Sequence, residues 1–389
     1  MSALPDEYQD LTDWLIESAL TEVPIQETLR EFGERLLAAG IPTHRINCST
    51  FQRHQIMGAV DTTWDSDRGV HDTEFIPKSV IMSHNITNTP AGELARSGLS
   101  IREYDLCDAE VRSRFTMLQS LSERGYTDYM ILNKSYGRTW NEPGLDHQSE
   151  GVYGSFATRN IDGFSKAHKD TIKGLWPYFS LYLKTATERL LSARLLEAYV
   201  GVLPARNILN GMIELGDGSR INCVLWFSDL RGSTHHSNRL SADSYLKLLN
   251  DYFNCTAGAV IDHGGEVLKL IGDGVMAIFP FQAGTEADAC SRALAAAQAS
   301  LQMAREIDQP DLQFGIGLHI GEGTLGNIGT ATRLDMTVTG LSANQVTRVE
   351  ALTKLLPVSV LASPQFCNAT ADQHTSIGEF SLPDFGGMT

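Results

Sequence analysis

Two alternating apolar runs, EVLKLI and VMAIF, flank Gly272-Asp273-Gly274 within residues 266–279. An Asp-Gly pair between two such runs is among the strongest local signals for a tight β-hairpin. Taken alone, Asp273 is therefore a turn residue. Whether it does more depends on which other segments the fold brings beside this hairpin.

The second half of the chain alternates strand-like and helix-like segments around the hairpin. The pattern predicts, in order, a strand (221–229), a helix (241–263), the hairpin (266–281), a helix (285–307), a strand (312–320), a glycine-rich hairpin, a helix (342–355) and a strand (357–363). Two long helices on a mainly antiparallel sheet describe a βαββαβ, ferredoxin-like arrangement. We therefore predict an α+β domain over residues 207–389.

The first half has a different pattern. Apolar residues at helical spacing on both sides of Pro24 predict two helices within 11–39. Further segments are strand-like runs at 44–51, 79–83, 128–136 and 151–158, and a helix at 109–124. Residues 1–164 thus form a predicted α+β domain, whose order of elements resembles a GAF-type sensor or dimerisation module. Trp64, Tyr129 and Tyr153 could line a ligand pocket there, although aromatic residues on strands more often belong to the core.

Residues 165–206 are predicted to connect the two domains. Apolar side chains recur at three- and four-residue steps from Ile172 to Val200, as in a long amphipathic helix, with a kink near Gly174 and Pro177. Two interpretations remain open at this point. The stripe either packs on its own domain or pairs with a second chain as a two-stranded dimer helix.

Composition excludes several classes of partner. The formal net charge is −16, from 31 basic and 47 acidic residues, and no Lys/Arg cluster offers a surface for nucleic acid or an anionic membrane. No apolar stretch approaches the ~18 residues that span a bilayer, and the acidic N-terminus does not resemble a secretory signal. We expect a cytoplasmic protein whose six widely spaced cysteines are reduced.

A second aspartate, Asp229, is expected to lie beside Asp273 in the fold. Asp229 ends the apolar strand of VLWFSDLRGST, residues 224–234. In a ferredoxin-like sheet the end of the first strand lies next to the tip of the following hairpin, so the two carboxylates should meet. Carboxylates placed close together repel each other, and a divalent cation keeps both ionised. Oxygen ligands of this kind suit Mg²⁺ or Mn²⁺.

The loop after Asp229 offers a place for phosphates. It is rich in small residues and leads into a helix, whose first backbone N–H groups favour anions. The predicted phosphate-binding amides are those of Leu230, Arg231, Gly232, Ser233 and Thr234. Together with a divalent cation, such a loop fits a nucleoside triphosphate.

These segments resemble a known family. VLWFSDLRGST, HGGEVLKLIGDGVMAIF and GNIGTATRLDMTVTGLSANQVTRVE stand in the order and spacing of the class III nucleotidyl cyclase catalytic domain, in the bacterial subgroup with threonine at the second base-reading position. The resemblance covers roughly residues 207–365. By position it implies that two metal ions are held by Asp229, Asp273 and the Leu230 carbonyl, that the base is read by Lys269 and Thr337, that the ribose is oriented by Asn344, and that the transition state is stabilised by Arg348.

The base contacts bear on the substrate. Adenine offers an acceptor at N1 and a donor at its amine, which match a lysine and a threonine hydroxyl, whereas the N1–H and amine donors of guanine call for a carboxylate. Neither Lys269 nor Thr337 is acidic, which favours ATP. The reaction that the resemblance implies is attack of the ribose 3′-hydroxyl on the α-phosphorus, giving cyclic AMP and pyrophosphate.

In this family the two halves of each site come from opposite subunits. Because both halves are present in this chain, the resemblance implies a head-to-tail homodimer with two equivalent sites. An unidentified small molecule or protein is expected to regulate it through residues 1–164. Two alternatives remain: a nucleotide-binding regulatory protein without turnover, and a guanylate cyclase, which Lys269 and Thr337 disfavour.

Overall fold

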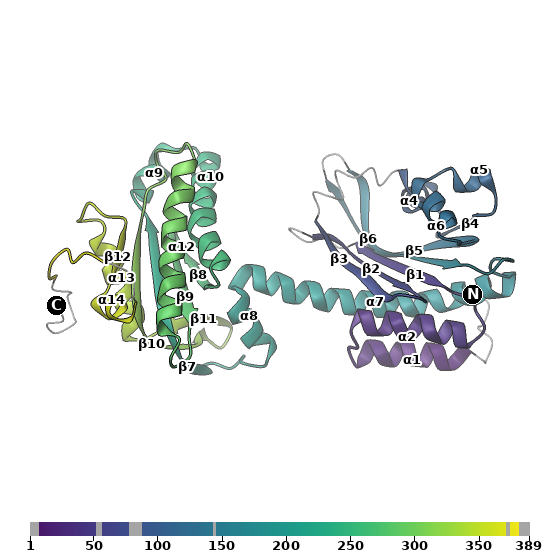
Figure 1. Cartoon of the computed structure of the whole chain (residues 1–389), viewed down its shortest axis with the longest axis horizontal. Coiled ribbons are helices and arrows are strands. Elements are labelled where there is room, and N and C mark those ends of the chain that lie inside the picture. Colours follow the sequence, from purple (N-terminus) through teal and green to yellow (C-terminus); the bar gives the residue numbers. More distant parts are fainter. Residues whose placement is uncertain (1–7, 52–56, 78–87, 143–144, 371–373, 381–389) are drawn as a thin grey trace. The chain divides into compact units, whose positions relative to one another are not determined.

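The computed structural model describes residues 8–51, 57–77, 88–142, 145–370 and 374–380. The chain divides into two compact units, Met1–Ser192 and Ala193–Thr389. The division falls inside helix α7 (Lys166–Val200), and each unit is built of helices packed on a β-sheet (Figure 1). Within the described ranges, no helix is long and apolar enough to cross a lipid bilayer. The strand predicted at 79–83 lies outside the described residues.

The first unit has a six-stranded antiparallel sheet in the order β3-β2-β1-β6-β5-β4. Its strands are β1 (Arg45–Phe51), β2 (Met57–Asp65), β3 (Gly69–Pro77), β4 (Ile101–Asp105), β5 (Asp128–Glu142) and β6 (Leu145–Thr158). Its helices before α7 are α1 (Gln9–Leu20), α2 (Ile25–Ala38), α4 (Pro90–Ser97), α5 (Ala109–Arg112) and α6 (Thr116–Glu123). The α+β prediction and the two N-terminal helices are confirmed, and the GAF-like resemblance stays a prediction.

One predicted helix of this unit is wrong in its extent. Residues 109–124 form two short helices, because Phe115 adopts an extended conformation between them. The Phe115 side chain is buried in a small core with Tyr104 and Leu118. Burial of this ring therefore outweighs the continuation of one helix through residue 115.

Each face of the sheet packs against its own helices. On one face, α1, α2 and the first turns of α7 cover a core that contains Trp64 (Figure 1). On the other face, α4, α5 and α6 pack over β4 and β5, and Tyr129 lies in that second core. Trp64 and Tyr129 are buried core residues on opposite faces, so they do not share a pocket.

The first part of the apolar stripe on helix α7 packs on its own domain. Ile172, Leu175, Phe179 and Leu183 are buried in the core of the first unit, so this part of the stripe packs on its own domain. The helix continues through Pro177 without a break in its assignment. Pairing of residues 190–200 with a second chain stays a prediction.

The second unit also carries one principal sheet, in the order β11-β10-β7-β9-β8, with β12 parallel to β10. Its strands are β7 (Gly218–Leu230), β8 (Glu266–Ile271), β9 (Gly274–Pro280), β10 (Phe314–Thr330), β11 (Arg333–Thr339) and β12 (Val360–Ala362). Its helices are α8 (Val202–Leu209), α9 (Ser233–Arg239), α10 (Ala242–Phe253), a π-helical turn (Asn254–Gly258), α11 (Ala259–Asp262), α12 (Glu286–Glu306), α13 (Leu341–Leu352) and α14 (Pro364–Ala369). The order β10-β7-β9-β8 is that of a βαββαβ unit.

Residues of β7 alternate between two cores. Val224 and Trp226 face α10 and α12, whereas Cys223 and Leu225 face the core shared with α8 and α13. This period of two places Asp229 on the same face as Leu225. Asp229 consequently lies on the side of the sheet that carries α13.

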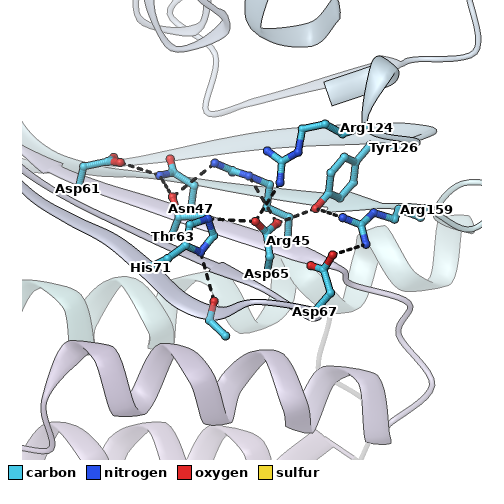
Figure 2. Close-up of polar contacts among 11 residues, drawn as sticks. Arg45, Asn47, Asp61, Thr63, Asp65, Asp67, His71, Arg124, Tyr126 and Arg159 are labelled. Carbon is cyan, nitrogen blue, oxygen red and sulfur yellow. Dashed lines mark hydrogen bonds and ion pairs between the residues drawn. The ribbon is translucent and has the colours of Figure 1, made fainter. Parts of the chain in front are cut away.

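The first unit also contains a buried carboxylate, Asp65, at the end of β2. Figure 2 shows basic and hydroxyl groups converging on it from several elements. Its oxygens lie 3.0 Å from an Arg124 nitrogen and 3.1 Å from His71 Nε2, and accept a 2.6 Å hydrogen bond from Tyr126 Oη. Arg45 approaches to 3.8 Å. The Asp65 side chain has no exposed surface, so it ties β1, β3 and the end of α6 to one charged centre.

Replacement of Asp65 by Asn should destabilise the first unit. The amide keeps the size of the side chain but removes its charge, leaving Arg124 without its buried counter-charge. We expect a loss of about 3 kcal/mol in the free energy of unfolding. Urea unfolding of the full chain followed by tryptophan fluorescence measures it, because four of the five tryptophans lie in this unit.

Asp67→Asn is the matched control. Asp67 also faces an arginine, Arg159, at 3.3 Å, but its side chain is 52% exposed. We expect no measurable change in the unfolding midpoint for this variant. Equal effects of the two substitutions would contradict a special role for the buried carboxylate.

Candidate functional site

Asp229 and Asp273 are carried on two adjoining strand ends. Asp229 pairs in register with Gly274, the residue that follows Asp273. The Leu230 N–H then donates a 3.1 Å hydrogen bond to the Asp273 carbonyl oxygen. The predicted proximity of the two aspartates is confirmed at the level of the backbone, and Asp273 is a residue of the β8–β9 turn, as its Asp-Gly sequence indicates.

A lysine lies against Asp229. The Lys354 ammonium, two residues beyond the end of α13, forms an ion pair with Asp229 Oδ2, and its nitrogen is 3.8 Å from Glu350 Oε2. Burial raises the pKa of Glu350 to about 7. Burial also disfavours the charged form of Lys354, but the pKa of Lys354 is nevertheless raised, because Asp229 and Glu350 stabilise the ammonium. Neither Lys354 nor Glu350 was predicted from the sequence as a site residue.

Two glycines bring α13 close to β10 beside Asp229. A Cβ atom on Gly317 would lie 2.6 Å from the Glu350 backbone nitrogen and 2.7 Å from the Val346 carbonyl oxygen. A Cβ on Gly315, which pairs with Asp229, would lie 2.0 Å from Thr353 Oγ1. Only glycine allows this approach, which fixes the end of α13 next to the metal-ligand candidates.

Two backbone N–H groups of the predicted phosphate loop are already hydrogen-bonded within the chain. The Leu230 N–H is bound to Asp273, and the Arg231 N–H donates a 2.7 Å hydrogen bond to the Gln313 carbonyl. The Arg231 guanidinium donates to the carbonyls of Thr353 and Val358, at 2.9 and 2.7 Å. The prediction that the Leu230 and Arg231 amides bind phosphate is therefore corrected, because strand and loop pairing already uses both N–H groups.

The remaining phosphate-binding candidates are Gly232, Ser233 and Thr234. Gly232 has a φ of +69°, a left-handed conformation that glycine adopts without strain. It immediately precedes the first residue of α9, Ser233. The phosphate contacts predicted for these three residues stay a prediction.

A third residue, Asp335, lies beside the base-reading candidate Lys269 and on the same strand as Thr337. The Lys269 ammonium forms an ion pair with Asp335 Oδ2, although β8 and β11 stand at opposite ends of the strand order. Asp335 and Thr337 are two residues apart on β11 and so face the same side. Asp335 was not predicted from the sequence, and the signal that could have identified it is this two-residue spacing from Thr337.

Asn344 and Arg348 lie four residues apart on α13, at exposed positions. The opposite side of the helix, including Val346 and Glu350, is buried against the sheet. Side chains four residues apart share one helical face. The fold therefore presents both candidates on one solvent-facing surface of the unit, and their predicted roles stay predictions.

The donor set fits a hard divalent cation. Among the described residues, no three or more His, Cys, Asp and Glu side chains converge as a metal site. Two carboxylates and one carbonyl leave several positions of an octahedral shell to water or phosphate oxygens, which is typical of Mg²⁺. The Lys354 ammonium at Asp229 shows that a positive charge is accommodated at this point.

Comparison with known proteins assigns this region. Residues 218–383 match the family described as the adenylate and guanylate cyclase catalytic domain. These residues form a class III cyclase catalytic domain. Such domains are lyases that act on nucleotides and depend on divalent metal ions. The resemblance found in the sequence is confirmed for this region, whereas the threonine subgroup stays a prediction.

Known relatives align with the cyclase domain but extend well beyond it. An adenylate cyclase of Anabaena cylindrica is 32% identical over 171 residues, which are 42% of this chain and 33% of the relative. The terminal-differentiation specific adenylate cyclase of Dictyostelium discoideum is 30% identical over 178 residues, or 44% of this chain and 8% of the relative. This chain thus spans a third or less of the length of these two relatives.

One solved structure is similar over about half of this chain. A bacterial light-regulated adenylyl cyclase shares 28% identity with this chain and a TM-score of 0.42, over 51% of this chain and 58% of that one. The assignment of the cyclase domain rests on the sequence matches and not on this superposition.

The contact between α13 and β10 can be tested by adding one methyl group. Gly317→Ala should push α13 away from β10 and lower the stability of the cyclase domain by about 2 kcal/mol, since the helix backbone cannot yield locally. Hydrogen exchange of amides in α13 and β10, read by mass spectrometry, measures the loss of protection.

Gly258→Ala is the control for this prediction. Gly258 has helical backbone angles and no atom within 4 Å of an added Cβ, so alanine should be neutral or slightly stabilising. Unchanged protection in Gly317→Ala would show that α13 can shift freely on the sheet.

Proposed function

We propose that the protein is an adenylate cyclase that converts ATP to 3′,5′-cyclic AMP and pyrophosphate. The observation that carries the proposal is the joined pair Asp229 and Asp273 within a segment of the cyclase family. Both relatives described above are named adenylate cyclases, and their similarity supports the same activity here. The presence of Lys269, Asn344 and Arg348 at the family's functional positions argues against a protein that has lost turnover.

The residues have separate roles in this proposal. Two divalent cations, Mg²⁺ or Mn²⁺, would be held by Asp229, Asp273 and the Leu230 carbonyl, and when bound they supply activation of the 3′-hydroxyl and neutralisation of phosphate charge. Asn344 orients the ribose so that its 3′-oxygen faces the α-phosphorus. Arg348 neutralises the charge that grows on the α-phosphoryl group as pyrophosphate leaves.

The base contacts support ATP but also favour a second candidate. Lys269 and Thr337 match the acceptor and donor of adenine. Asp335, however, places a carboxylate against Lys269, and a carboxylate is the acceptor that guanine N1–H and its amine would require. GTP is accordingly the second candidate substrate. ATP is preferred because the Asp335 carboxylate already accepts from Lys269.

A shared active site is part of the proposal. The exposed positions of Asn344 and Arg348 suit contact with nucleotide held by a second copy of the chain in a head-to-tail homodimer. Residues 1–164 would regulate the enzyme, with α7 carrying the signal. A rotation of that helix would change how two cyclase domains meet.

The first test is product formation by the purified full chain with ATP or GTP, in Mg²⁺ or Mn²⁺. We expect cyclic AMP and pyrophosphate from ATP, at a rate that falls ~100-fold or more in Asp273→Asn, since loss of one ligand charge weakens metal binding. Chromatography quantifies both products. Cyclic GMP as the main product would establish the second candidate, and nucleotide binding without any product would indicate a regulatory protein.

The shared site predicts complementation between two inactive chains. Asp273→Ala removes a metal ligand and Arg348→Ala removes the transition-state contact, so each homodimer should be inactive. An equal mixture should regain about one quarter of the wild-type activity, because half of the dimers are mixed and each of these has one intact site. A mixture that stays inactive, while both variants still dimerise, would rule out a site shared between chains.

A further inference from the structure

The strongest unassigned feature of the cyclase domain is the ion pair between Lys354 and Asp229. The Lys354 ammonium contacts Asp229 Oδ2 and lies 3.8 Å from Glu350 Oε2. The side chain of Asp229 is 21% exposed, whereas that of Glu350 is only 2% exposed. Lys354 therefore contacts a partly exposed carboxylate, Asp229, and lies near a buried one, Glu350.

The backbone around Lys354 is fixed from two directions. Gly315, the register partner of Asp229, is in close contact with Thr353 and with Glu350, whose Oε1 would be 2.7 Å from an added Cβ. Arg231 donates to the carbonyl oxygens of Thr353 and Val358, so it anchors the chain before and after Lys354. With the backbone held in this way, the lysine stem is the adjustable part of the contact.

The position of this ammonium has a consequence for metal binding. Asp229 and Asp273 lie on adjoining strand ends, and a positive charge placed there offsets the repulsion between neighbouring carboxylates. Lys354 supplies one such charge from within the chain. A divalent cation that binds Asp229 through Oδ2 must compete with the Lys354 ammonium for that oxygen.

We propose that Lys354 is a built-in counter-ion of Asp229 that a divalent cation displaces, so that this lysine keeps the affinity of the site for metal low in the absence of nucleotide. The inference rests on the proposed metal site. Glu350 makes the displacement feasible, because its carboxylate is a second partner that the Lys354 ammonium can reach after it leaves Asp229. The anionic triphosphate that arrives with the metal is a further partner for the freed ammonium.

The test measures Mn²⁺ binding to the full chain without nucleotide, from the electron paramagnetic resonance signal of free Mn²⁺. Lys354→Met keeps the apolar stem and removes the charge, and we expect its Kd for Mn²⁺ to fall about fivefold. Lys354→Arg retains the charge and should remain near the wild type. Lys354→Gln repeats the measurement should the methionine variant fail to fold.

Lys247→Met is the matched control. Lys247 also forms an ion pair with an aspartate, Asp251, at 2.8 Å on α10, and it loses the same unit of charge. Its Mn²⁺ affinity should change less than twofold. If Lys354→Met and Lys247→Met both bind Mn²⁺ more tightly by a similar factor, the effect comes from net charge alone and the proposal is overturned.

Asp273→Ala distinguishes a failure of the proposed metal site from a failure of the role proposed for Lys354. If Mn²⁺ binds the wild type, the binding is lost in Asp273→Ala, and Lys354→Met binds no more tightly than the wild type, the role of Lys354 is refuted and the metal site stands. If neither the wild type nor Lys354→Met shows binding that depends on Asp273, the metal site itself is refuted, and the role of Lys354 falls with it.

Discussion

The candidate site depends on one backbone hydrogen bond, from the Leu230 N–H to the Asp273 carbonyl. It extends the antiparallel pairing of β7 with β9 by one step beyond Asp229 and Gly274. Strand pairing of this kind is cooperative with the whole sheet, so the separation of the two aspartates is set by the core and not by their own interactions. The sheet thus holds the backbones of these two acidic residues side by side, whatever the repulsion between their side chains.

The first unit contains a fully buried carboxylate, whereas the carboxylate at the candidate site of the second unit is partly exposed. Asp65 in the first unit has no exposed surface, and groups from several elements neutralise or hydrogen-bond its oxygens. Asp229 in the second unit is partly exposed, and its cationic partner is a flexible lysine. A fully surrounded carboxylate stabilises a fold, whereas one with a displaceable partner is available for a ligand. This contrast is the physical reason to place the chemistry in the second unit.

Helix α13 links the parts of the second unit. Its buried face rests on Gly315 and Gly317, its exposed face carries Asn344 and Arg348, and the turn that follows it carries Lys354 to Asp229. The absence of side chains at the two glycines is what lets one helix serve all three contacts. A shift of α13 would move its exposed face and the Lys354 ammonium at Asp229 together.

The sequence by itself determined the local elements and most of the candidate site. The Asp-Gly hairpin, the apolar strand that ends at Asp229 and the helical spacing of Asn344 and Arg348 are short-range patterns, and each was readable without the fold. The split of residues 109–124 into two helices was not, because burial of Phe115 in a core from other segments outweighs helical spacing. Tertiary structure alone also decided that the Leu230 and Arg231 amides are occupied, that Asp335 meets Lys269 across the strand order, and that Lys354 reaches Asp229. The two lysine contacts join residues that are 66 and 125 positions apart, and only the closed sheet with α13 packed on it brings such distant side chains together.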